Sequence, residues 1–257
     1  DVDPKYNQEM IQKSVKKKFK GHQTLNAKAA PLYPSALESQ YRGLTNAYMK
    51  ILNQVVSKYL PRIKKAAEAE RGGPRRSDDL NSLMSAIQAA FAEMAKELDV
   101  QTERFDLYGK LEALAHQSEK LSVRQWKRII GKTLGLDLAD DYYLGQFFQE
   151  LLDRWVSENV ALIKTIPQDS LNEMREIVYE GYRTGQTTTS IVKEIQHTYQ
   201  VNKRHARLIA RDQMAKLNAD LTKRQQTDAG VESYKWSTSS PCAGGPPPSK
   251  RQDIPVG

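Results

Sequence analysis

The stretch that decides the fold is VNKRHARLIARDQMAKLNADLTKRQQTDAGVESYKW, residues Val201 to Trp236. It predicts one long basic helix that begins at Asn202, turns at Gly230 and runs into a short strand. Asparagine is a favourable N-cap residue, and glycine readily takes the left-handed conformation that ends a helix. Apolar residues recur inside the stretch at spacings of three or four, so they share one face, which we expect to be buried. They are Ala206, Ala210, Met214, Leu217 and Leu221.

The other face of this predicted helix is cationic. Lys203, Arg207 and Arg211 follow one another at four-residue spacing and therefore form a row. Asp212 precedes Lys216 by four residues, and an acid-first pair of this kind stabilises a helix by about 0.2–0.5 kcal/mol. We therefore expect a helix with one apolar face toward the core and one charged face toward solvent.

Three segments in the second half of the chain resemble a known family. They are ENVALIKTIP at 158–167, EGYRTGQTTTSIVKEI at 180–195 and RHARLIARDQMAKLNADLTKRQQTDAGVESYKWST at 204–238. In this order and at these spacings they resemble the phage head-morphogenesis proteins typified by the F protein of phage Mu, also called minor head or minor capsid proteins. The resemblance spans residues 121–238.

The resemblance implies a non-enzymatic protein of the phage head that acts in head assembly, DNA packaging or DNA delivery. Its implied partners are the portal protein and the major capsid or scaffolding protein, and no cofactor is implied. Its implied location is the virion, near the portal vertex, after assembly in the host cytoplasm. The matching family positions have structural roles, and we expect the last of them to pack against the long helix. They are Gly185, Ile209, Ala210, Arg211, Asp212, Gly230 and Trp236.

The net charge of the chain favours a polyanionic partner such as nucleic acid. The formal charge is +8 at pH 7, and the sequence pI is about 9.3. A basic soluble protein that binds nothing acidic is the alternative. No duplex-reading motif or aromatic platform occurs, so DNA would be contacted non-specifically, through its phosphates. The candidate contacts are Lys16, Lys17, Lys18, Lys203, Arg204, Arg207 and Arg211.

The first 120 residues are predicted to form a basic arm and a helical bundle. Within residues 1–30, Ile11, Val15 and Phe19 recur at four-residue spacing among lysines. This pattern suits either a short amphipathic helix that docks on a partner or a mobile arm. Residues 31–120 should form an antiparallel bundle with tyrosines in its core and at its rim. The expected helices cover 36–70, with a bend or interruption near Pro61, then 78–98 and 102–118.

Residues 121–238 are predicted to form the family-like unit, and residues 239–257 an irregular tail. Pro167 should break the chain, Gly185 should end a helix, and the residues from Thr187 to Ser190 offer N-caps for the next one. Helices are expected at 122–131, 142–164, 169–185 and 191–199, before the long helix.

No catalytic constellation is visible in the sequence. Asp137, Asp140 and Asp141 could hold a hard cation, but acids before a helix are also ordinary caps. The single cysteine, Cys242, lacks a histidine neighbour and excludes an internal disulfide. The histidines are scattered, and catalysis would need a positioned partner. They are His22, His116, His197 and His205. The chain also has no apolar run long enough to span a membrane.

The tail departs from the family pattern. Where that pattern continues as Asp-x-Arg-Val-Arg-x-x-His, this chain has SPCAGGPPPSKRQDIPVG, in which prolines and glycines are too frequent for helix or strand. One hypothesis is an extended segment that lies along a partner groove. The other is a frameshift in the gene, which its nucleotide sequence would test.

The predicted fold is mainly α, with a helical N-terminal region and a compact helical C-terminal unit that ends in a short β-strand. The predicted function is structural: an adaptor that binds the portal or the capsid interior, with its cationic helix near packaged DNA. The alternative is a DNA-binding or ejection factor whose main ligand is the genome. A nuclease or protease is disfavoured because acid/base clusters are missing.

Overall fold

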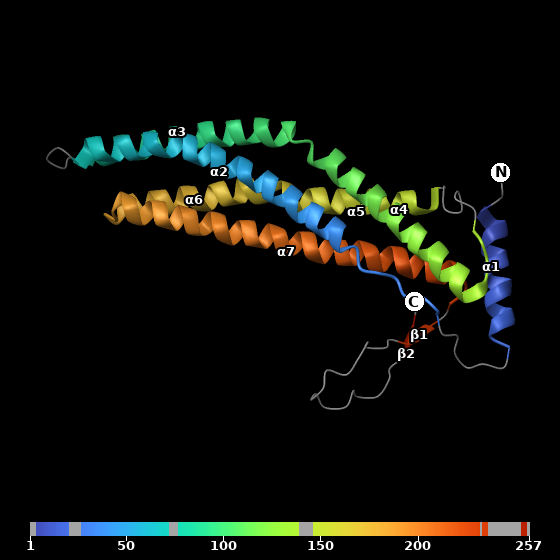
Figure 1. The fold of residues 1–257 in the computed structure, drawn as a ribbon. Coiled ribbons are helices and arrows are strands. Elements are labelled where there is room, and N and C mark those ends of the chain that lie inside the picture. The colour runs from blue at the N-terminus through green and yellow to red at the C-terminus, as the bar shows by residue number, and fades with distance from the viewer. Residues whose placement is uncertain are drawn as a thin grey trace, which may run out of the picture. The chain divides into compact units, whose positions relative to one another are not determined.

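The computed structural model describes residues 4–20, 27–71, 77–138, 146–231, 233–235 and 253–255. These residues are mainly helical, as predicted (Figure 1). The helices are α1 (Pro4–Lys18), α2 (Ser35–Arg71), α3 (Ser77–Arg104), α4 (Leu107–Leu134), α5 (Gln146–Lys164), α6 (Ile166–Arg183) and α7 (Thr188–Asp228). Strands β1 (Ser233–Lys235) and β2 (Asp253–Pro255) pair antiparallel, with Tyr234 opposite Ile254.

Helix α7 is one continuous helix of 41 residues. The prediction of two helices separated before Asn202 is wrong, because Asn202 lies inside α7 and its side-chain amide donates to Glu173 Oε2 at 2.9 Å. The buried face continues through the predicted break, since Ile195 and Tyr199 are buried in line with Ala206. A capping preference is weak beside the packing of a whole helical face, so tertiary contacts override it.

Both predicted glycine turns are confirmed. Gly185 ends α6 with a φ of +78°, and Gly230 ends α7 with a φ of +74°. At each turn the next amide bonds back over five residues, from Gln186 to the Gly181 carbonyl and from Val231 to the Gln226 carbonyl. This pattern satisfies carbonyls that the helix end leaves unpaired.

The boundary between α3 and α4 differs from the prediction. The expected helices 102–118 and 122–131 are wrong, because Leu107–Leu134 is one helix and α3 extends to Arg104. The turn between them contains Asp106, which has a φ of +52° and accepts a hydrogen bond from the Gly109 amide at 3.1 Å. A short acidic side chain tolerates this backbone conformation and caps the helix start.

The two prolines that were expected to interrupt the chain both lie within helices. Pro61 lies inside α2, which runs without a break from Ser35 to Arg71. Helix α6 begins at Ile166, not at Asp169 or Ser170, and Pro167 occupies its first turn. The first amides of a helix have no intrahelical acceptor, so the missing proline amide costs no bond there.

A short strand lies in the tail, where the sequence predicts only irregular structure. Strand β2 follows the segment in which prolines and glycines are most frequent. Proline is tolerated at the edge of a sheet, because an edge residue needs no donor on its outer side. A two-stranded pair has only edges, and Pro255 lies opposite Ser233. The prediction is therefore wrong for Asp253–Pro255.

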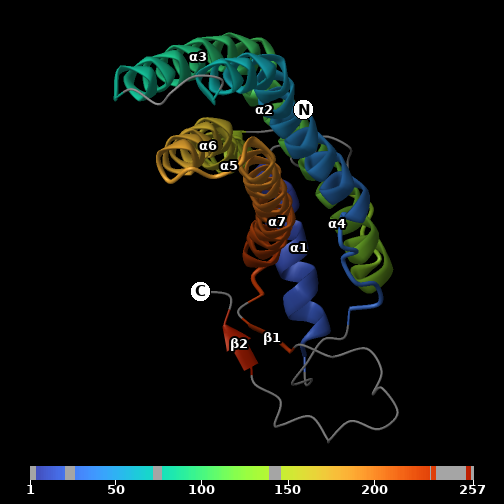
Figure 2. The ribbon, with the colours of Figure 1, turned by 90° about the vertical axis from the view of Figure 1, so that its left-hand side faces the viewer.

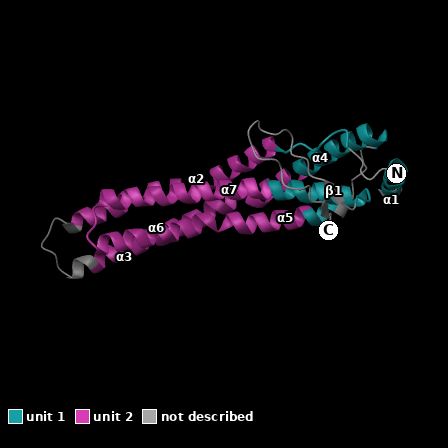
Figure 3. Ribbon diagram, turned by 90° about the horizontal axis from the view of Figure 1, so that it is seen from below, with its two compact units in different colours: residues 1–34, 117–151, 215–257 teal, residues 35–116, 152–214 magenta. Residues whose placement is uncertain are grey.

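The chain forms two compact units, and each draws on both halves of the sequence (Figure 3). Unit 1 comprises residues 1–34, 117–151 and 215–257, and unit 2 comprises residues 35–116 and 152–214. The division predicted from the sequence, into residues 1–30, 31–120, 121–238 and 239–257, follows chain order. Contacts between long helices group residues that are far apart along the chain, so compact units need not follow chain order.

Unit 2 is a bundle in which α2, α3 and α6 contact one another. Figures 1 and 2 show α2 alongside α3. Lys58 bonds to Glu97 and Arg62 to Glu93, each at 2.7 Å, and this reciprocal order establishes that the two helices are antiparallel. Tyr41 is fully buried, in line with the predicted packing role of the α2 tyrosines.

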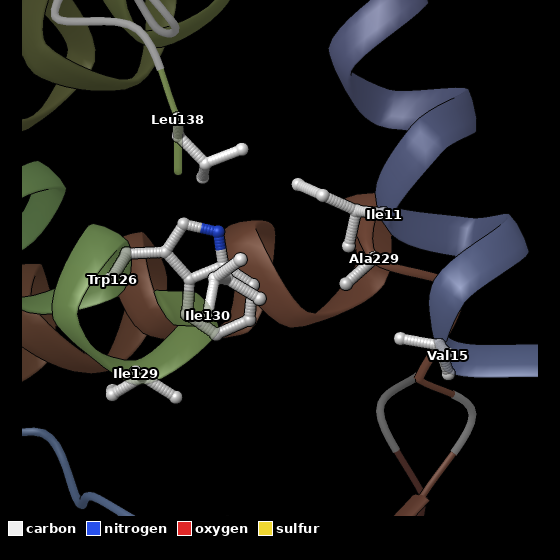
Figure 4. Packing of buried hydrophobic residues seen from close by; sticks show 7 residues of the cluster. All are labelled: Ile11, Val15, Trp126, Ile129, Ile130, Leu138 and Ala229. Carbon is white, nitrogen blue, oxygen red and sulfur yellow. The ribbon is translucent and has the colours of Figure 1, made fainter. Parts of the chain in front are cut away.

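Unit 1 is built around an apolar cluster to which α1, α4 and the end of α7 contribute (Figure 4). Its buried members are Ile11, Val15, Trp126, Ile129, Ile130, Leu138 and Ala229. The Gln12 side-chain amide also donates to the Asp228 carbonyl at 3.0 Å. The predicted arm therefore contains a helix that packs on its own chain, not a mobile segment, because its apolar side chains find partners in α4 and α7.

Candidate interaction surface on helix α7

The inner face of α7 is buried as its spacing predicts. Every residue of the predicted apolar row is at most 1% exposed: Ala206, Ala210, Met214, Leu217 and Leu221. Burial of such a row fixes the rotation of the helix about its axis. The side chains on the opposite side must then face solvent.

A buried hydrogen-bond network holds α7 against α2 and α5 within unit 2. The Tyr41 hydroxyl donates to Asn159 Oδ1 at 2.6 Å. The Asn159 amide donates to the Trp155 carbonyl at 2.7 Å, and the Trp155 indole donates to the Gln213 carbonyl at 3.0 Å. Because burial disfavours the phenolate, the pKa of Tyr41 is raised, and its hydroxyl remains a donor at neutral pH. The network positions the segment of α7 that carries the predicted cations.

The predicted α7 cations differ in their surroundings. Arg204, Arg207 and Arg211 are exposed. Arg204 donates to the Gln200 carbonyl of its own helix at 3.3 Å. The Lys203 ammonium is half-buried and lies 5.9 Å from the centre of the Tyr199 ring. Lys203 thus points toward the bundle side of the helix, and the three arginines form the solvent-facing set.

Two exposed apolar side chains lie among these arginines. Leu208 is 56% exposed and Val201 is 41% exposed. Residues seven apart lie on nearly the same side of a helix, so these two side chains share a line with Arg204 and Arg211, which alternate with them. We call Val201, Arg204, Leu208 and Arg211 the α7 stripe. The sequence-based prediction did not include Val201 and Leu208, although their seven-residue spacing places them together outside the buried row.

The α7 stripe is poor in acidic neighbours. No aspartate or glutamate occurs between Glu194 and Asp212. Within the described part of the chain, the Arg207 and Arg211 guanidinium groups make no hydrogen bond or ion pair. Elsewhere a carboxylate accompanies an arginine, as at Arg183 with Glu180, 2.8 Å apart. The charge of Arg211 on the stripe, and that of Arg207 beside it, is thus available to a ligand.

The predicted lysines of α1 have different surroundings. Lys16, Lys17 and Lys18 are exposed in the last turn of α1, where cations complement the partial negative charge of a helix C-terminus. The Lys18 ammonium also donates to the Thr133 carbonyl at 2.8 Å. These lysines belong to unit 1, and the α7 arginines belong to unit 2.

The family positions divide into structural and exposed ones. Gly185 and Gly230 form the two left-handed turns, and Ala210 is fully buried. Ile209 is half-buried, whereas Arg211 and Asp212 are exposed. The predicted packing of Trp236 lies outside the described residues.

No group of three or more histidine, cysteine, aspartate or glutamate side chains among the described residues could hold a metal ion. Asp140, Asp141, His22 and Cys242 lie outside the described residues. None of the described helices is both long and apolar enough to cross a membrane.

Comparison with known proteins leaves the family open. The chain is similar to an uncharacterized protein of Haemophilus influenzae, with 29% identity over 105 residues. The similar region covers 41% of this chain but 24% of that relative, so the chain spans about a quarter of the relative's length. No protein-family profile matches the chain, and no solved structure matches it at a significant level.

Proposed function

We propose that this chain is a head-morphogenesis protein of a phage, a structural adaptor without enzymatic activity that binds the portal or the capsid interior. The resemblance to the Mu F-like proteins over residues 121–238, with its short terminal strand, supports this function. As far as Met214, the segments that carry this resemblance lie mainly in α5, α6 and α7. Within unit 2 the buried network joins α5 to α7, and the bond between Asn202 and Glu173 joins α7 to α6. Helices held together by such hydrogen bonds suit a protein that acts by binding a partner.

The observation that carries the proposal is the α7 stripe. It combines Arg211, which has no described partner, Arg204, which bonds within its own helix, and two exposed apolar side chains, on a helix whose opposite face is held in a bundle. Interfaces between proteins bury apolar and arginine side chains and surround them with polar groups. Such a surface recognises a partner without any chemical step.

Co-purification with the portal protein from the same phage genome tests this function. A complex built on apolar helix faces should persist from low to high salt, and electron microscopy should show this chain on the portal ring. Failure to associate at either salt concentration, with portal and chain both folded, would remove the adaptor function.

DNA is a second candidate ligand, and Arg207 and Arg211, which have no partner in the described part of the chain, favour it. Phosphate contacts release counterions, so affinity should fall steeply as salt rises. Neutralising Lys203, Arg207 and Arg211 together should weaken binding to duplex DNA and flatten its salt dependence. Unchanged affinity in this triple variant would exclude the α7 face as a DNA site.

A further inference from the structure

The exposed apolar residues of the α7 stripe distinguish it from an ordinary charged helix face. The Leu208 side chain is flanked along the helix by Arg204 and Arg211, and Val201 lies two turns before it. From Val201 to Arg211 the stripe is roughly 15 Å long, at 1.5 Å per residue. A second helix of about three turns would cover it.

The charges around the stripe are asymmetric. On an α-helix of 100° per residue, Arg207 lies on the same flank of Leu208 as Arg204 and Arg211, whereas Asp212 lies on the other flank. Glu173 bonds to Asn202, which lies on the Asp212 side of the helix and away from the three arginines. A partner would therefore meet a line of apolar groups with a cationic row along one side.

We propose that the α7 stripe docks an acidic amphipathic helix of a partner protein, an inference that rests on the proposed adaptor function. Apolar side chains seven residues apart on the partner pack on Val201 and Leu208. Carboxylates along one edge of the partner helix pair with Arg204, Arg207 and Arg211. Charge complementarity selects an acidic partner, and the apolar line sets the register of the two helices.

A protein helix explains the stripe better than DNA does. Duplex DNA is bound through phosphates, and these offer no apolar surface to Leu208. Asp212 beside the stripe would also repel a phosphate backbone, whereas a partner helix can place a neutral or cationic residue there. The apolar contact should therefore matter to affinity as much as the charges do.

The experiment measures binding of the full chain to a synthetic probe helix by fluorescence anisotropy. The probe is a 21-residue peptide with leucines at seven-residue spacing and glutamates along one flank, a length of about six turns. The controls are a peptide of the same composition in scrambled order and a 24-base-pair DNA duplex, about 80 Å long. Each ligand is titrated at two salt concentrations.

Matched variants separate the apolar from the ionic contribution. Leu208→Ser should weaken peptide binding about tenfold. Leu162→Ser is its control, because Leu162 is 42% exposed on α5 and lies outside the stripe. Arg207→Gln combined with Arg211→Gln should weaken binding at low salt more than Lys50→Gln combined with Lys65→Gln, which changes two exposed lysines of α2. All variants alter exposed side chains, and circular dichroism verifies that they fold.

Each outcome decides the proposal. Preferential binding of the ordered peptide, lost in Leu208→Ser and kept in Leu162→Ser, supports it. Equal binding of ordered and scrambled peptides overturns it, and so does peptide binding that is insensitive to Leu208→Ser. A chain that associates with the portal protein but not with the probe peptide retains the adaptor function and loses this inference. The reverse result retains the helix-docking surface and removes the portal assignment.

Discussion

The lysines at the end of α1 and the arginines of α7 form similar cationic clusters in the sequence, yet they have different surroundings. In α1 the Lys18 ammonium is bonded to the Thr133 carbonyl, and the helix is held by Ile11 and Val15 in the unit 1 cluster. In α7, the bond that Arg204 makes stays within its own helix, because its acceptor is the Gln200 carbonyl. Lys16 and Lys17, like Arg207 and Arg211, have no partner among the described residues. The comparison teaches that similar cationic runs differ in whether one of their bonds joins two elements of the fold.

The largest expected effect tests whether α1 is truly anchored. Ile11→Ala removes a fully buried side chain from the unit 1 cluster and should lower the free energy of unfolding by about 2–5 kcal/mol. Urea unfolding followed by circular dichroism measures it. Phe19→Ala is the control, because Phe19 is 38% exposed and its loss should cost far less. Equal stability of both variants would mean that α1 is a free arm, and the contrast with α7 would disappear.

The next prediction uses the pH dependence of stability to test the end of α7, where it meets α1. Burial raises the pKa of Asp228 to about 6, against a smaller opposing effect of Arg224, 3.6 Å away. The unfolded chain releases this proton near pH 4, so the stabilising contribution is complete below that pH and is lost as pH rises through about 6. The loss is at most about 3 kcal/mol. Asp228→Asn should remove this component from the pH dependence of Tm, and an unchanged profile would contradict the assignment.

The third effect tests the support beneath the α7 stripe. Tyr41→Phe leaves Asn159 Oδ1 without its 2.6 Å donor and should cost about 1–3 kcal/mol of unfolding free energy. Tyr59→Phe is the matched control, because Tyr59 donates to a half-buried Glu97 and solvent can replace that bond. Chemical denaturation of the two variants in parallel should show the larger loss in Tyr41→Phe. A loss no greater than that of the control would show that the network does not hold α7.

The smallest effect compares the two cation clusters directly. Lys18→Gln removes a structural hydrogen bond and should lower stability by about 0.5–1.5 kcal/mol. Arg207→Gln and Arg211→Gln remove exposed charges without described partners and should change stability by less than about 0.5 kcal/mol. Thermal melts at constant ionic strength measure both. A greater loss from the arginine variants would reverse the comparison.

The sequence predicts what depends on neighbours along the helix. Spacings of three and four residues identify the buried row that includes Ala206 and Leu221, and glycine chemistry identifies the turns at Gly185 and Gly230. Capping and helix-breaking residues predicted wrong helix boundaries where tertiary packing opposed them. Asn202 has the chemistry of an N-cap, but the apolar face continues past it and the helix does not stop. Pro167 lies in the first turn of α6, where a residue needs no intrahelical acceptor for its amide, so it does not break the helix.

The candidate site was only half predictable. The arginines were visible as a cationic row, and the predicted buried row already places Leu208 on the opposite side of α7. Whether another element of the fold covers that side depends on contacts between residues far apart in the chain. Only the structure shows that Leu208 is 56% exposed.

By itself the sequence determined a mainly helical chain, the buried face of α7 and the glycines that end α6 and α7. These features depend on residues within about one or two turns of each other, where geometry is fixed by the helix itself. Only the tertiary structure decided that α1 packs on its own chain, that Lys18 bonds to Thr133 in another helix, and that the compact units do not follow chain order. Those facts depend on contacts across more than a hundred residues, such as Lys18 with Thr133, which local spacing does not encode.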